Sequence, residues 1–134
     1  MSLPDPGPKT GRCLCGATRF AFSGAPNWVA HCHCESCRRA TAAPVATYVG
    51  VPHGAWEWTG EAPVTWRSSP DVRWLRCGAC GSLVAYDSDR EPDEIHFPLA
   101  LVDDPAGLAP SAHAFRAEAV DWLSLNDALP AGAR

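Results

Sequence analysis

Residues 12–20 read RCLCGATRF and place two cysteines, Cys13 and Cys15, on either side of a single leucine. In an extended segment residues i and i+2 face the same way, so both sulfur atoms can reach one metal ion. Two cysteines supply only half of the closed tetrahedron that a structural zinc site requires. The rest of the chain must therefore provide two further ligands.

A second cysteine pair lies more than sixty residues later, in the segment RCGACGSLV at residues 76–84. Cys77 and Cys80 have the spacing of a zinc knuckle, in which two thiolates sit on a tight turn and Gly81 relieves the backbone. Together with the first pair, this knuckle would complete a closed four-cysteine site.

The remaining three cysteines lie in HCHCESCRR, residues 31–39. Cys32 and Cys34 share a face if the segment is extended, and Cys34 and Cys37 share a face if a helical turn begins there. All three can then converge on one ion. A site with three protein ligands and an open position is typical of catalytic zinc.

Another grouping of the cysteines is open at the level of sequence. Cys34 and Cys37 form one CxxC pair, and Cys77 and Cys80 form another. Together these two pairs could hold one zinc or one iron ion. That grouping leaves three cysteines without a role, so it is the less economical one. A thioredoxin-like redox pair is disfavoured because no βαβ pattern surrounds either CxxC.

Length and composition favour a small intracellular domain. The chain has 134 residues, and its seven cysteines, an odd number, argue against a complete disulfide framework. The start, MSLPDPGPK, lacks a basic segment followed by an apolar one, and no run is long enough to span a membrane. We therefore expect a reducing, cytoplasmic location. The net charge of -4 disfavours nucleic acid and anionic membranes as partners.

Turn signals recur at short intervals and separate short segments rich in Val, Thr, Trp, Tyr and Phe, which predicts a mainly antiparallel β domain. We expect a flexible N-terminal arm over 1–9, a single zinc-binding domain over 10–130 and a tail over 131–134. One helical turn is expected from Cys34 into Arg39. Strands are expected near 17–22, 27–32, 44–51, 55–59, 63–68, 72–77, 83–87 and 94–101, with a further one near 113–118.

The segments GRCLCGATRF, HCHCESCRR and RCGACGSLV, in this order, resemble the glutathione-dependent formaldehyde-activating enzyme family, which also contains centromere protein V-like proteins. The closing segment EAVDWLSLNDALP is similar to that of the family as well. The chain departs from the family at Arg76, where an aromatic residue is frequent, and at residues 40–43, where a glycine is frequent. The resemblance implies a β-tent fold with two zinc sites. It implies structural zinc on Cys13, Cys15, Cys77 and Cys80, and catalytic zinc on Cys32, Cys34 and Cys37.

The same resemblance implies a zinc-dependent carbon–sulfur lyase. Its partners would be a small glutathione-type thiol and an aldehyde, joined for example as S-hydroxymethylglutathione. Three thiolates would present zinc to the substrate thiol, and coordination would keep that thiol deprotonated. Arg38 or Arg39 could hold a substrate carboxylate, because the guanidinium fork is bidentate. The alternative is a non-catalytic binding module stapled by zinc.

The histidines carry weaker signals. In an extended segment His31 and His33 face away from the neighbouring cysteines, so we expect them to support the site or lie at the surface. His96 is expected to point to solvent, and His113 carries no functional signal of its own.

Overall fold

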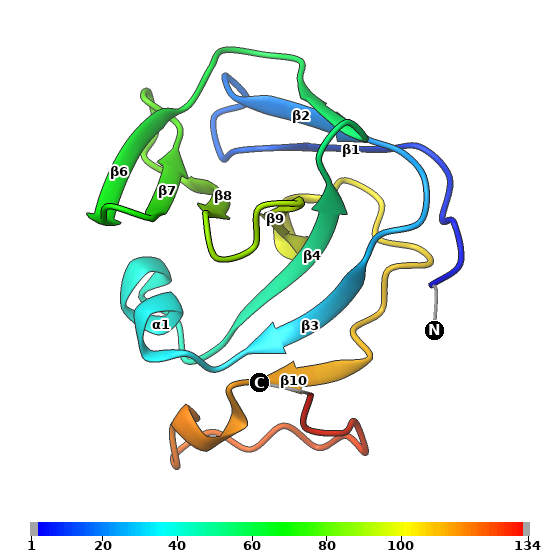
Figure 1. Cartoon of the computed structure of the whole chain (residues 1–134), viewed down its shortest axis with the longest axis vertical. Coiled ribbons are helices and arrows are strands. Elements are labelled where there is room, and N and C mark those ends of the chain that lie inside the picture. The colour runs from blue at the N-terminus through cyan, green and yellow to red at the C-terminus, as the bar shows by residue number, and fades with distance from the viewer. Residues whose placement is uncertain (1–2, 133–134) are drawn as a thin grey trace.

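The computed structural model describes residues 3–132. Within this range the chain forms two β-sheets, one α-helix and two short 3-10 helices (Figure 1). The elements are β1 (Lys9–Arg12), β2 (Arg19–Phe22), β3 (Trp28–Cys32), α1 (Glu35–Thr41), β4 (Ala46–Pro52), β5 (Trp56–Trp58), β6 (Val64–Ser69), β7 (Val72–Arg76), β8 (Leu83–Ser88), β9 (Glu94–Pro98), η1 (Leu99–Leu101), β10 (Ala112–Ala114) and η2 (Arg116–Glu118).

The strands form a three-stranded sheet in the order β1-β2-β5 and a seven-stranded sheet in the order β10-β3-β4-β9-β8-β7-β6. All pairings are antiparallel except that of β10 with β3, which is parallel. The prediction of a mainly β, largely antiparallel fold is therefore confirmed. In Figure 1 the lower end of β3 and β4 lies next to α1, and the hairpin of β6 and β7 stands on the other side of that helix.

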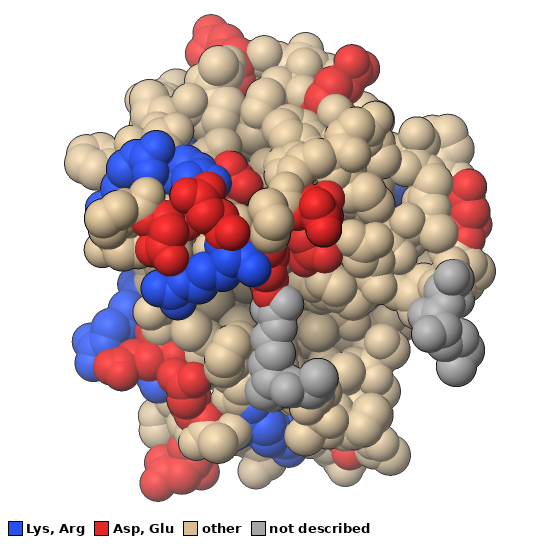
Figure 2. Space-filling model, in the orientation of Figure 1, with Lys and Arg blue, Asp and Glu red and all other residues tan. Residues whose placement is uncertain are grey.

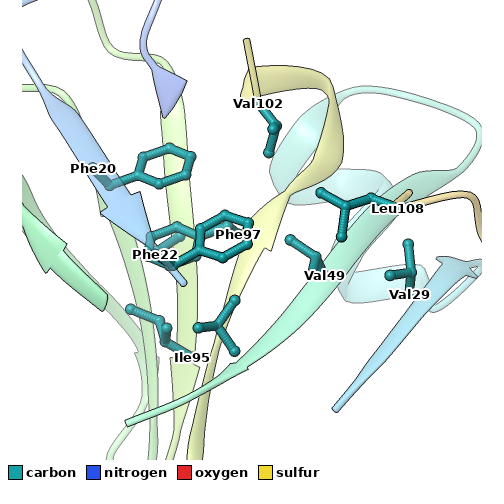
Figure 3. Packing of buried hydrophobic residues seen from close by; sticks show 10 residues of the cluster. Phe20, Phe22, Val29, Val49, Ile95, Phe97, Val102 and Leu108 are labelled. Carbon is teal, nitrogen blue, oxygen red and sulfur yellow. The ribbon is translucent and has the colours of Figure 1, made fainter. Parts of the chain in front are cut away.

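The main hydrophobic core lies between the small sheet and the middle of the large one. Phe20 and Phe22 of β2 stack against Phe97 of β9, with ring centroids 4.1 and 5.9 Å apart (Figure 3). Val49 and Ile95, which are almost fully buried, belong to the same cluster. Aromatic residues bury a large apolar area, so this stack accounts for much of the attraction between the two sheets.

Gly11 in β1 is required by that stack. It pairs with Phe20 across the strands, and a Cβ atom at position 11 would lie 2.2 Å from the Phe20 ring. Any side chain there would push the ring out of the core. Strand β1 therefore carries a glycine at the point where Phe20 crosses it.

The helix α1 follows directly from β3, with Cys34 at its N-cap position. It ends at Ala42, which adopts the left-handed conformation at φ 54° and whose N–H donates to the Arg38 carbonyl. A left-handed C-cap is usually a glycine, since other residues are strained there. This explains why a glycine in this region suits the fold, and it marks Ala42 as a strained position in this chain. The Arg76 guanidinium donates to the carbonyl of Ala40, so the departure at position 76 ties β7 to the end of the helix.

Three expectations about element boundaries are corrected by the structure. Lys9, placed in the arm by its neighbouring prolines, begins β1, where its buried Nζ donates to the Ala106 carbonyl at 2.8 Å. The strand expected over 94–101 ends at Pro98 and turns into a 3-10 helix. The strand expected near 113–118 is limited to 112–114, and residues 116–118 form a 3-10 helix. Residues 1–2 of the expected arm and 133–134 of the expected tail lie outside the described range.

Charged side chains of both signs lie beside one another on the face shown in Figure 2. Ion pairs include Arg73 with Asp87 at 3.0 Å and Arg90 with Asp71 at 2.8 Å. Among residues 3–132, no helix is long and apolar enough to cross a membrane.

Candidate metal centres and active-site pocket

The two cysteine pairs at the ends of β1 and β7 come together in one group, called here the closed cluster: Cys13, Cys15, Cys77 and Cys80. Their sulfur atoms all lie within 4.8 Å of one another. Cys15 Sγ is 3.7 Å from Cys13 Sγ and 3.8 Å from Cys77 Sγ. Tetrahedral coordination with metal–sulfur bonds of about 2.3 Å separates the sulfurs by about 3.8 Å, so the geometry fits a four-thiolate metal site.

Hydrogen-bond donors surround the closed cluster. The Ser82 hydroxyl lies 3.1 Å from Cys80 Sγ, and donation from Ser82 lowers the pKa of Cys80 to about 5. The Thr18 hydroxyl and backbone N–H groups, including that of Ala79, lower the pKa of Cys77 to about 7. These donors favour the thiolate form, which is the form that binds metal.

The other three cysteines form the open cluster: Cys32 at the end of β3, Cys34 at the N-cap of α1, and Cys37 in its first turn. Cys32 Sγ and Cys37 Sγ are 3.5 Å apart. The contact with Cys37 lowers the pKa of Cys32 to about 7, while the contact with Cys32 and burial raise the pKa of Cys37. One thiol of the pair is thus readily ionised at neutral pH.

The structure separates the cysteines into four and three, so the alternative grouping of Cys34 and Cys37 with Cys77 and Cys80 does not form. Within residues 3–132, no further Cys, His, Asp or Glu ligand atom joins the open cluster. Three sulfur ligands leave one position of a tetrahedron for a molecule from outside the chain.

The open cluster faces a pocket of about 740 Å³, which lies within the usual size range of small-molecule sites. All three of its cysteines line this pocket, and none of the closed cluster does. The remaining wall comes from β3, β4, β7, β8 and β9 and from the segments around Ser68, Arg90 and Phe115. The open cluster is therefore the one that a small molecule can approach.

Aromatic rings form much of the pocket wall. Trp28 and Tyr86 contact His96, with centroids 4.6 and 5.2 Å apart, and Trp74 contacts Tyr86 at 4.8 Å. Tyr48, the fifth ring, lies 6.1 Å from His96. Sequence reasoning missed Tyr48, because its place near the open cluster depends on the register of β4 with β3, in which Ala46 pairs with Cys32.

His96 was expected to point to solvent, and that expectation is wrong. Its side chain is buried within the pocket wall, with Nε2 lying 2.6 Å from Glu94 Oε2 and 2.7 Å from Glu91 Oε2. Burial opposes ionisation of Glu94, but hydrogen bonds from His96, Asn27 and Trp28 lower its pKa below the ordinary value. These three residues could hold an ion by type, yet distances of 2.6–2.7 Å are those of hydrogen bonds.

His113 was also misjudged from the sequence. It is fully buried, and its Nδ1 lies 2.8 Å from His33 Nε2 while its Nε2 lies 2.9 Å from Asp127 Oδ1. These contacts connect Asp127 in the C-terminal segment, through His113, to His33, which lies between Cys32 and Cys34. His33 is buried against His113 and does not lie at the surface.

The arginines after the open cluster do not line the pocket. Arg38 donates from Nε to the His33 carbonyl, and Arg39, with a largely exposed side chain, pairs with Glu35 at 3.5 Å. Arg90 does line the pocket and was not anticipated, because it comes from an unremarkable polar loop between β8 and β9.

These features define a class of protein: a mainly β domain with one closed and one open cysteine cluster, each of which could hold a metal ion. The family described as "Glutathione-dependent formaldehyde-activating enzyme" matches residues 8–118, and the chain belongs to that family. The matched segment contains all seven cysteines. Family membership thus links the chain to glutathione-dependent formaldehyde activation.

The fold is similar to that in the crystal structure of a Rhodobacter sphaeroides protein, with a TM-score of 0.60 and 19% sequence identity. The similarity covers 75% of this chain and 94% of that one, and at this identity it bears on the fold alone. No curated protein matches the chain.

Proposed function

We propose that the protein is a zinc-dependent carbon–sulfur lyase-like enzyme that joins and separates a glutathione-type thiol and a small aldehyde, with S-hydroxymethylglutathione as the model product. The observation that carries the proposal is the open cluster, whose three sulfurs line a pocket and have no fourth ligand among the described residues. The all-sulfur donor sets and the spacing of 3.5–3.8 Å between neighbouring sulfurs suit zinc.

In this proposal the closed cluster has a structural role. Cys13 and Cys77 are almost fully buried, and all four of its positions are filled by protein sulfur. A metal held there would link the turn after β1 to the turn after β7. Because such a site is absent from the unfolded chain, its binding free energy would contribute directly to folding.

Cys32, Cys34 and Cys37 would hold the second zinc and carry the catalytic role. Zinc bound there would supply a positive charge that keeps an incoming thiol in its nucleophilic thiolate form. The chain's own residues orient the reactants. Aromatic side chains line the pocket, and Cys37 is the buried residue of the first turn of α1.

Recognition of a substrate carboxylate by Arg38 or Arg39 stays a prediction. Arg90 is a third candidate, since it lines the pocket while its Nε pairs with Asp71. A guanidinium presents five donors, so the remaining ones can bind a carboxylate.

A non-catalytic zinc-stapled module is the alternative. A scaffold gains nothing from a cluster with an open position in a pocket, and this favours the enzyme. Metal analysis separates the two. The enzyme predicts two zinc ions per chain, one of which is displaced or contacted by added thiol, and Cys37→Ser should retain one zinc and a folded domain. A single metal ion in the wild-type protein would contradict the proposal.

A further inference from the structure

Tyr48 occupies a distinctive place in the pocket. It lies in the middle of the large sheet, on β4, opposite Ala30 of β3 and Pro98 of β9. Its side chain is 2% exposed, lines the pocket, and packs in the same apolar cluster as Cys32 and Cys37. The phenol is thus fixed by the sheet beside the open cluster.

The indole N–H groups of the two tryptophans in the wall have hydrogen-bond partners within the chain. Trp28 Nε1 donates to Glu94 Oε2 at 2.7 Å, and Trp74 Nε1 donates to Ser68 Oγ at 2.9 Å. The buried Tyr48 hydroxyl has no hydrogen-bond partner among residues 3–132. Leaving a buried hydroxyl unpaired costs free energy, so such a group calls for a partner from outside the chain.

The hydroxyl is available as a donor. A phenol has an ordinary pKa of about 10, so its hydroxyl carries a proton at neutral pH and can donate it in a hydrogen bond. The Cys37 sulfur lies nearby, and sulfur is a weak hydrogen-bond acceptor. A protonated phenol beside three sulfurs is suited to an oxygen that carries negative charge.

We propose that Tyr48 is a further catalytic residue, whose hydroxyl donates a hydrogen bond to the oxygen of the thiol–aldehyde adduct. The inference rests on the proposed function. When the adduct forms, the thiolate sulfur bonds to the carbonyl carbon, the C=O π bond breaks, and its electron pair moves to oxygen. That oxygen then takes the proton that the thiol released, which yields R–S–CH2–OH, while Tyr48 keeps its own proton throughout.

The test compares Tyr48→Phe with Trp66→Phe, a control that makes a conservative aromatic substitution at an exposed ring outside this pocket. Exchange of formaldehyde between its free form and its glutathione adduct is followed by NMR. One hydrogen bond to a developing charge is worth about tenfold or more, so kcat/KM should fall at least about tenfold in Tyr48→Phe. The control should stay within about twofold of the wild type.

Two further readouts do not depend on activity. The wild type should bind S-(hydroxymethyl)glutathione about tenfold more tightly than S-methylglutathione, and Tyr48→Phe should bind the two equally. Thermal unfolding of Tyr48→Phe should begin no lower than that of the wild type, because the lost hydroxyl has no hydrogen-bond partner among the residues that the structure describes.

A Tyr48→Phe variant that keeps both the wild-type rate and the wild-type preference would overturn the inference. So would a lower melting temperature with loss of zinc from the open cluster, because the hydroxyl would then support the cysteines. If the wild type itself does not accelerate exchange, the proposed function fails, and the binding preference alone decides whether Tyr48 recognises the adduct oxygen.

Discussion

Replacing Cys13 by alanine tests whether the closed cluster holds the fold together. Cys13 is 1% exposed and is the point where β1 meets the sulfurs that follow β7. Its loss leaves three sulfurs in the closed cluster. We expect the variant to lose the metal of the closed cluster and most of its stability.

The expected loss of stability can be judged from the binding free energy of a structural zinc ion. Structural zinc in small domains binds with apparent free energies of about 10–16 kcal/mol at neutral pH. Losing even half of the lower figure, about 5 kcal/mol, would equal the whole stability of a marginal small domain. Cys13→Ala should therefore be largely unfolded at 25 °C, or melt far below the wild type.

Circular dichroism during heating, with zinc counted on the same samples, measures this directly. The matched control is Cys34→Ala, a half-buried cysteine of the open cluster. The control should lose one zinc and still melt cooperatively. The reasoning is refuted if Cys13→Ala melts within a few degrees of the wild type, or if the two variants lose equal stability.

Two other predictions concern the fold. Gly11→Ala should destabilise the protein by about 1–3 kcal/mol in urea titration, because the new Cβ meets the Phe20 ring in the core, and an unchanged unfolding midpoint would contradict this. The Nε2–H of His113 lowers the pKa of Asp127 below its ordinary 3.8, so this contact stabilises the fold above that pH and is lost as the pH falls through the lower, folded value. The protection of C-terminal amides from exchange, relative to the intrinsic rate at each pH, should therefore fall in acid for the wild type, and Asp127→Asn should show low protection already at pH 7; equal protection in both proteins at pH 7 would contradict this.

Cysteine spacing was sufficient to predict the closed cluster and the open cluster. Close pairs such as Cys13 and Cys15 are constrained by local geometry, which sequence reasoning handles well. The pairing of Cys13 with Cys77 followed from counting ligands, because seven cysteines divide into a closed set and an open one. Most other strands were predicted for a similar reason, since short alternating segments between turns have few other structures to adopt, but β1 at Lys9–Arg12 was not predicted.

The residues that line and support the pocket were harder to predict from the sequence. His113 reaches the open cluster only because β10 pairs in parallel with β3, a contact between segments eighty residues apart. His96 looked solvent-facing because its neighbours Ile95 and Phe97 are apolar, yet all three are buried since β9 has a packed layer on each face. Tyr48 on β4 and Trp74 on β7 line the same pocket, although β9 and β8 lie between their strands in the sheet. Long-range register decides all of these contacts, and one sequence does not reveal it.

The central claim is that the open cluster performs thiol–aldehyde chemistry. NMR exchange spectroscopy with glutathione and formaldehyde, using wild type and Cys37→Ser at equal zinc content in the closed cluster, tests it most directly. The account predicts that the wild type accelerates exchange well above the uncatalysed rate and that folded Cys37→Ser does not. Equal exchange with both proteins would contradict it.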